Sequence, residues 1–252
     1  MKTRLFTIAF LFISFITQAQ STAEQLQKAN SLYKQFKEEE ALNVYKQILA
    51  ADSNNMEALL KCTELSSSIG AKQADKNSKA VYFIAAKEYA DKALTINGNS
   101  AEANYAQALA YANLSQIETE NKKTVEDVRQ IKVYADKGMA VNPNHALLNY
   151  MEGKWHYELL ALNWFKKTAL KAFYGNGLAK PDIDSAIYYM EKCRTLEPYF
   201  VQNYLDLAKA YNLKDRPTQA IEVLTKMVKL PNRTAADASL KEEGKKMLQG
   251  LQ

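Results

Sequence analysis

The chain has 252 residues, of which 47% are hydrophobic and 24% are charged, and this composition is typical of a folded protein with its own core. Only 8 glycines and 5 prolines occur over this length, which favours long helices joined by short turns and argues against a β-sandwich. The net charge of +5 is too small to indicate nucleic-acid binding, which usually requires a concentrated basic patch.

The N-terminal residues have the pattern of a secretory signal peptide. A basic start precedes an almost wholly apolar run of twelve residues, 5–16. Thr17 and Ala19 then place small residues at positions −3 and −1 of a cleavage site. Because a spanning helix needs about 20 apolar residues, the run is too short for a membrane anchor. We therefore expect a signal peptide at 1–19, a helical domain at 20–252 and a periplasmic or secreted location, without a membrane span.

A repeated segment organises the rest of the chain. Residues 41–53 have counterparts at 86–98, 131–143, 186–198 and 220–232. Each opens on a small or aliphatic residue, has further packing residues four and seven positions later, and closes on a turn residue. Positions 0, 4 and 7 form one stripe of a helix, and small residues in that stripe let two helices approach closely. The spacing resembles the second half of the tetratricopeptide repeat (TPR).

This register predicts an all-α TPR-type superhelix of about five helix pairs and a C-terminal capping helix. Two longer connections are expected, at 66–70, which is rich in serine, and at 118–123, which is charged. The capping helix, at about 235–250, should pack through Leu240, Met247, Leu248 and Leu251. The expected pairs are 22–36 with 38–51, 55–69 with 78–97, 101–117 with 123–142, 145–174 with 182–196, and 201–213 with 217–229.

The stretch 147–174 is unusual for a repeat helix. Its apolar residues, which include Trp155, Trp164 and Phe173, go round more than one face, as in a helix buried among neighbours. At ~1.5 Å per residue a single helix over this stretch would be ~40 Å long. The Gly-Asn-Gly of residues 175–177 is expected to end it.

This stretch also resembles a particular family, the regulator of microtubule dynamics proteins. The resemblance rests on the Gly-Lys-Trp of 153–155, the Leu-Asn-Trp of 162–164, the Ala-Phe-Tyr-Gly of 172–175 and the repeat that ends in Pro198. It covers about residues 100–252 and implies a divergent TPR fold with one extended helix. An exported chain would not meet microtubules, so the resemblance implies this fold and not that role.

No motif indicates catalysis, a cofactor or a metal. The chain has no nucleophile elbow, phosphate-binding loop, dinucleotide fingerprint or HExxH sequence. Glu152 and His156 could share a helix face, but zinc needs three or four ligands, so His156 is expected to pack between helices. Asp182 is expected to cap a helix. Cys62 and Cys193 fall in separate repeats and should be buried thiols, although a bridge between them stays open.

Four residues are candidates for contact with a partner, because the register places them on the concave groove: Tyr150, Lys154, Tyr157 and Lys209. Tyrosine beside a basic side chain suits a peptide with an acidic or aromatic anchor. Packing of the tyrosines between helices is the alternative. The carboxylate clamp of chaperone-binding TPR proteins would need Lys and Asn where this chain has Leu26 and Asn30, so the clamp is incomplete.

The sequence therefore predicts an exported, non-enzymatic scaffold that binds a protein or peptide of unknown identity in its concave groove. A structural subunit of an envelope assembly is the first alternative, and an enzyme with an unrecognised site is the second.

Export can be tested directly by N-terminal sequencing of the protein isolated from cells that produce it. We expect the mature chain to begin at Gln20, because residues 1–19 carry the signal-peptide pattern. A chain from the envelope fraction that still begins at Met1 would reject the prediction.

Overall fold

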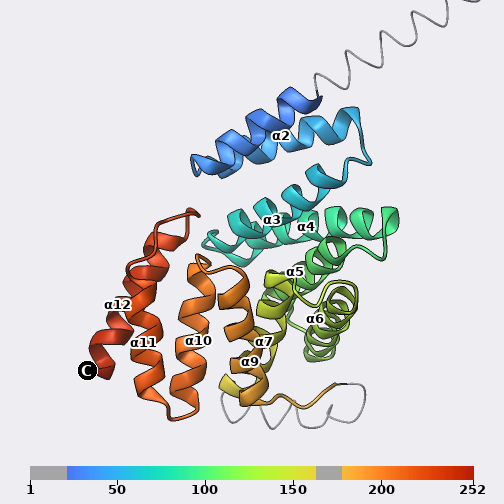
Figure 1. The fold of residues 1–252 in the computed structure, drawn as a ribbon. Coiled ribbons are helices and arrows are strands. Elements are labelled where there is room, and N and C mark those ends of the chain that lie inside the picture. The colour runs from blue at the N-terminus through green and yellow to red at the C-terminus, as the bar shows by residue number, and fades with distance from the viewer. Residues whose placement is uncertain (1–21, 163–177) are drawn as a thin grey trace, which may run out of the picture.

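The structure, a computed structural model, describes residues 22–162 and 178–252. These residues form an all-α fold of antiparallel helix pairs stacked into a superhelix, as the repeat predicts (Figure 1). Residues 22–34 form the first helix. The helices that follow are α2 (Glu38–Ala51), α3 (Met56–Ala71), α4 (Lys76–Ile96), α5 (Ala101–Ile117), α6 (Asn121–Val141), α7 (Ala146–Ala161), α9 (Ile183–Leu196), α10 (Val201–Leu213), α11 (Pro217–Met227) and α12 (Asp237–Leu251).

The helices are arranged in two layers. Helices α3, α5, α7, α10 and α12 each contact the next member of that series, and together they form the inner layer. Helices α4, α6, α9 and α11 form the outer layer, and each packs against the inner helices that precede and follow it in the chain. The concave groove expected from the repeat would be formed by the inner layer.

Side-chain caps fix where many of these helices begin. A polar residue just before the helix accepts a hydrogen bond from the backbone N–H three positions later, which satisfies one of the free donors of the first turn. Asp182 caps α9 in this way, as predicted from the sequence. The other residues with this contact are Asn55, Asp75, Ser100 and His145.

The stripe at positions 0, 4 and 7 of each repeat is the packing surface that the sequence predicts. Every one of these side chains is buried, and most have no exposed surface at all. Small residues dominate the stripe in α4 and α6, which lets the neighbouring helices approach closely. The residues are Ala41, Tyr45 and Ile48; Ala86, Ala90 and Ala93; Ile131, Ala135 and Gly138; Ala186, Met190 and Cys193; and Ala220, Leu224 and Met227.

The contact between α7 and α9 leaves no room for a larger residue at Gly153. A Cβ atom added there would lie 2.7 Å from Cγ of Met190 and 2.8 Å from the backbone oxygen of Ala186. Both distances are shorter than real Cβ contacts. The glycine therefore sets how closely α9 approaches α7.

The expectation of a single ~40 Å helix over 147–174 is wrong. Helix α7 ends at Ala161, because Leu162 adopts an extended conformation with φ −54° and ψ 146°. Trp164, Phe173 and the glycines of 175–177 lie outside the described residues. Trp155 confirms the expected burial, since it is 3% exposed and its indole N–H donates to the backbone oxygen of Val128 at 2.9 Å.

The serine-rich segment 66–70 is also not a connection, because it forms the last part of α3. The hydroxyl of Ser67 donates to the backbone oxygen of Thr63 at 2.7 Å and accepts from the side-chain amide of Asn113 at 2.7 Å. The Ser67 and Asn113 side chains therefore join α3 to α5, while the buried hydroxyl of Ser66 has no hydrogen-bond partner among the described residues. The second expected connection is shorter than predicted, since α6 already begins at Asn121.

The C-terminal helix caps the inner layer as expected. Leu240, Met247, Leu248 and Leu251 pack against the core formed by α10 and α11, and most of the charged residues of α12 are exposed. The two cysteines are free and buried, one in α3 and one in α9. Burial raises the pKa of both the Cys62 and Cys193 thiols to about 12, so both stay protonated at neutral pH.

Substitution Gly153→Ala tests the close contact between α7 and α9. At an open helical site this change stabilises by about 0.5–1 kcal/mol. Here we expect it to lower the free energy of unfolding, because overpacking costs ~1–3 kcal/mol. Gly250→Ala in α12 is the control, since its Cβ would meet nothing within 4 Å, and it should leave stability unchanged or slightly raised. A higher melting temperature for Gly153→Ala would contradict the contact.

Candidate functional site

The four candidate contact residues come together on two adjacent inner helices. Tyr150, Lys154 and Tyr157 lie on α7, and Lys209 lies on α10. They gather around Asp206 of α10, a carboxylate that is 3% exposed. We call these five residues the Asp206 cluster.

One oxygen of Asp206 accepts three hydrogen bonds. Its Oδ2 atom lies 2.7 Å from the hydroxyl of Tyr150, 3.1 Å from Nζ of Lys154 and 3.0 Å from the amide nitrogen of Gln202. Two of these donors come from α7 and one from α10 itself. A buried carboxylate requires such partners, because an uncompensated charge away from water is costly. Asp206 therefore joins the two helices by side-chain contacts.

Lys209 extends the cluster to the capping helix. Its Nζ atom is 4.0 Å from Oδ1 of Asp206 and 2.7 Å from a carboxylate oxygen of Glu243 on α12. Lys154 has a second acidic partner in the same way, since its Nζ atom is 3.1 Å from a carboxylate oxygen of Glu158. The inner layer thus carries a line of alternating charges across α7, α10 and α12.

Burial and the Asp206 charge determine the protonation of the cluster. Burial raises the pKa of the Tyr150 hydroxyl well above its usual range, and the adjacent Asp206 raises it further. Burial alone would lower the pKa of Lys154, but the carboxylates of Asp206 and Glu158 oppose it and that pKa is raised. Burial, followed by Asp206, also raises the pKa of Tyr157. The tyrosines therefore stay neutral and Lys154 stays charged at physiological pH.

Within the cluster Tyr150 is buried, whereas the other three candidate residues are partly exposed. Tyr150 is only 7% exposed and meets the ring of Phe200 edge-on at 4.9 Å, so it packs between helices, as the alternative interpretation of the sequence had it. The side chains of Lys154 and Lys209 keep 27% and 31% of their surface exposed. Tyr157 is half-buried. These three residues can meet a partner, while Tyr150 supports them from below.

Asp206 is the residue that the sequence reasoning missed. The repeat register selected positions 202, 205, 209 and 212 of this helix, and Asp206 lies between them. A signal was present, because Asp206 is the only acidic residue of α10 and is flanked by Leu205 and Leu207. An isolated acid among apolar helix residues has to find a cation or several donors, and here it finds both.

The first helix pair presents a different arrangement at the position of the chaperone clamp. Asn30 accepts a hydrogen bond from the hydroxyl of Tyr45 at 2.7 Å and donates to Glu57 at 3.1 Å. Its amide is therefore used within the repeats. Nζ of Lys61 lies 5.3 Å from the ring centre of Tyr33 and 2.7 Å from a carboxylate oxygen of Glu64 on its own helix.

Both histidines have structural partners. Nδ1 of His145 caps α7, and Nδ1 of His156 accepts the backbone N–H of Asp182 at 3.0 Å, which ties the end of α7 to the start of α9. Within the described ranges, no group of three or more His, Cys, Asp or Glu side chains is placed to hold a metal ion. No helix in those ranges is long and apolar enough to cross a membrane.

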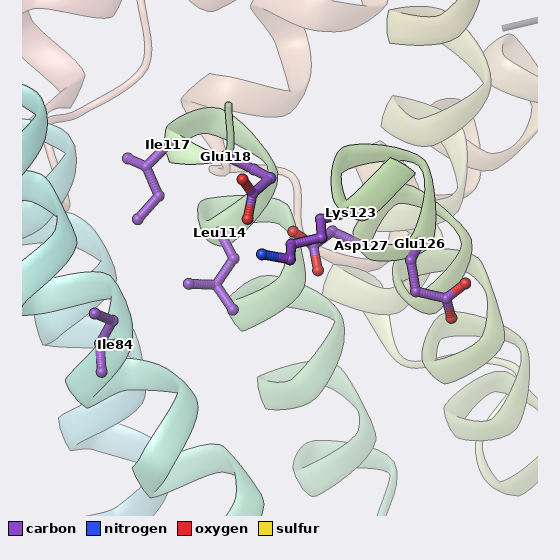
Figure 2. Close-up of a pocket in the computed structure, with 7 residues that line it drawn as sticks. All are labelled: Ile84, Leu114, Ile117, Glu118, Lys123, Glu126 and Asp127. Atoms are coloured by element: carbon purple, nitrogen blue, oxygen red, sulfur yellow. The ribbon is translucent and has the colours of Figure 1, made fainter. Parts of the chain in front are cut away.

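A second surface feature lies away from the Asp206 cluster. A pocket of about 320 Å³ opens between α4 and the first turns of α6, across the end of α5. One wall is apolar and the other carries acidic residues. The residues that line it are Ile84, Leu114, Ile117, Glu118, Lys123, Glu126 and Asp127 (Figure 2).

Comparison with solved structures confirms the TPR fold. A thermophilic TPR protein from Thermus thermophilus superposes with a TM-score of 0.67, covering 90% of this chain and 99% of that protein. The two sequences are 17% identical, so the likeness is one of fold.

Comparison of sequences identifies the family. Regulator of microtubule dynamics protein 1 of Caenorhabditis elegans is 25% identical over 189 residues, which are 75% of this chain and 80% of the nematode protein. The family described as regulator of microtubule dynamics protein 1-3 matches residues 25–252. The match is wider than the resemblance seen in the sequence, which began near residue 100, because it includes the N-terminal repeats. The chain belongs to the regulator of microtubule dynamics protein family.

Proposed function

We propose that the chain is an exported, non-enzymatic scaffold that binds a protein or peptide on the inner layer of its helices, with the Asp206 cluster as the contact surface. The observation that supports this most strongly is the set of partly exposed Lys154, Tyr157 and Lys209 side chains on a fixed base. Their helices are held together by a buried carboxylate with three donors. A partner would therefore meet side chains that are already positioned, which lowers the entropic cost of binding.

The chemistry of these residues favours a partner with an acidic or aromatic anchor. Lys154 and Lys209 each share their charge between two acidic neighbours, and both keep exposed surface. A carboxylate from a partner could replace Glu158 or Glu243, which are themselves more than half exposed. Tyr157 adds an amphipathic ring of the kind that is enriched at protein interfaces.

Export is supported by the sequence of residues 1–19 and determines which partners are available. In an extracytoplasmic compartment the partner would be another envelope or secreted protein. A permanent structural subunit remains the first alternative, and it predicts that the inner layer is covered by a neighbouring subunit in every molecule. An enzyme is less favoured, because neither the sequence nor the Asp206 cluster offers a nucleophile beside a base.

The family name supplies a second candidate function, a role in microtubule dynamics. The family match over residues 25–252 favours it, and the signal-peptide pattern argues against it. The two candidates differ in where the chain is found. A protein that keeps Met1 and stays in a cytoplasm with microtubules would favour the family role over the exported scaffold.

Photo-crosslinking can locate the binding surface. A benzoylphenylalanine residue placed at Tyr157 should form a covalent adduct with the partner in intact cells, because this side chain lies on the inner layer. The matched control is the same residue at Tyr188, which is 62% exposed on the outer helix α9. We expect the Lys154→Ala, Lys209→Ala double variant to weaken the adduct at position 157.

The proposed groove would be contradicted if position 188 formed the same adduct as strongly as position 157. It would also be contradicted if the double variant, folded as judged by circular dichroism, left the yield at position 157 unchanged. An adduct that consists only of a second copy of this chain would favour the structural-subunit alternative.

A further inference from the structure

Asp127 of α6 is a carboxylate without a partner in a partly apolar pocket. It is half-buried, and it makes no hydrogen bond or ion pair with any residue that the structure describes. Burial raises the pKa of Asp127 to about 6, and the nearby charges of Glu118 and Glu126 add to the increase. Lys87 of α4 opposes it only weakly. The pocket therefore holds a negative charge that the protein itself does not compensate.

The other charged residues around the pocket have partners of their own, and one carboxylate oxygen of Glu118 accepts the backbone N–H groups of Thr119 and Glu120 at 2.7 and 2.9 Å. Arg129 donates to Glu126 at 2.7 Å, and Lys123 pairs with Glu120 at 2.8 Å. These contacts use nearest neighbours on the same helix or its N-cap. Asp127 is thus the one acid lining the pocket that the described contacts leave for a molecule from outside.

The opposite wall of the pocket is exposed and apolar. Ile84 on α4 is 51% exposed, and Val81 one turn earlier is 68% exposed. Leu114 and Ile117 at the end of α5 continue this surface toward Asp127 (Figure 2). Single exposed aliphatic residues are common, but a group of them beside a pocket is typical of a binding surface.

We propose that this pocket docks a peptide segment in which a lysine or arginine lies beside an apolar side chain. The cation would pair with Asp127, and the apolar neighbour would cover Ile84 and Leu114. This proposal goes beyond the inner-layer scaffold, since the pocket is lined only by residues of α4, α5, α6 and the connection between the last two helices.

Charge complementarity and size select this occupant. Three acids and one lysine line the pocket, so it favours a cation. A metal ion would need several free oxygen ligands, whereas Asp127 is the one acid lining the pocket whose carboxylate accepts no described hydrogen bond. A volume of about 320 Å³ is at the lower end of ligand sites and suits one long side chain with part of its neighbour.

The uncompensated charge also has a consequence for stability. Because the folded-state pKa of Asp127 is raised from 3.8 to about 6, the folded protein binds more protons than the unfolded chain in that window. The stability contributed by this group therefore falls as the pH rises from 3.8 to about 6. We expect Asp127→Asn to raise the melting temperature at pH 7.5, and the increase to shrink as the pH approaches 4.

Glu88→Gln is the matched control for this measurement, because Glu88 is an exposed acid of α4 that does not line the pocket. It removes the same charge and should change the melting temperature little at either pH. An Asp127→Asn protein that is no more stable than the Glu88→Gln protein at pH 7.5 would show that the Asp127 charge is compensated.

Docking can be tested with two peptides and the full helical domain, residues 20–252. The first probe is acetyl-Ala-Leu-Arg-Leu-Ala-amide, and the second replaces arginine with citrulline, which has the same shape without the charge. Titrations followed by NMR of the ¹⁵N-labelled protein should show saturable shifts of the 114–127 amides with the arginine peptide. We expect the citrulline peptide to bind at least about tenfold more weakly, which corresponds to the loss of one partly buried ion pair.

The variants decide whether Asp127 is the source of this preference. Asp127→Asn should reduce the affinity ratio of the two peptides to about one, whereas Glu88→Gln should keep it. Equal binding of the two peptides by the unmodified protein would overturn the proposal. So would a preference that survives Asp127→Asn, or the absence of shifts at 114–127 with millimolar arginine peptide. Each of these results leaves crosslinking at Tyr157 unaffected, so the pocket and the inner layer are tested separately.

Discussion

A buried carboxylate at the junction of two inner helices, α7 and α10, constrains how these helices pack against each other. Asp206 is buried away from water, so its charge needs hydrogen-bond donors or a cation close by. Tyr150, Lys154 and Gln202 donate to it. Two of these donors belong to α7, which fixes the rotation and height of α7 relative to α10. Lys209 then connects the same carboxylate to Glu243 on α12. The inner surface proposed to bind a partner depends on this neutralised charge.

Small residues in the repeat make that arrangement possible. Gly153 and Ala186 let α9 approach α7 closely, and α9 in turn packs against α10. A bulkier stripe would separate the pairs and move Tyr150 away from Asp206. The order of dependence therefore runs from the spacing of small residues in the sequence, through helix packing, to the positions of the polar side chains on the inner layer.

The sequence predicted the features that follow from periodicity. The buried stripes, the pairing of helices and the placement of Tyr150, Lys154, Tyr157 and Lys209 on adjacent helices all depend on a fixed spacing. Features that depend on contacts between distant segments were missed. The partners of Asp206 are 52 and 56 residues away for Lys154 and Tyr150, and no local pattern reveals them.

Helix ends were predicted well where a cap or turn residue marks them and poorly elsewhere. Asp182 was correctly assigned as a cap, whereas the end of α7 at Ala161 has no glycine or proline beside it. The apolar pattern continues past that point, so the periodicity did not predict the end of the helix.

The free energy of unfolding of Asp206→Ala tests the central claim most directly. The account predicts a loss of about 1–3 kcal/mol, because the variant leaves the buried hydroxyl of Tyr150 without its acceptor, while Lys154 keeps Glu158 as a partner. A loss below about 1 kcal/mol, the size expected for an exposed pair, would contradict it.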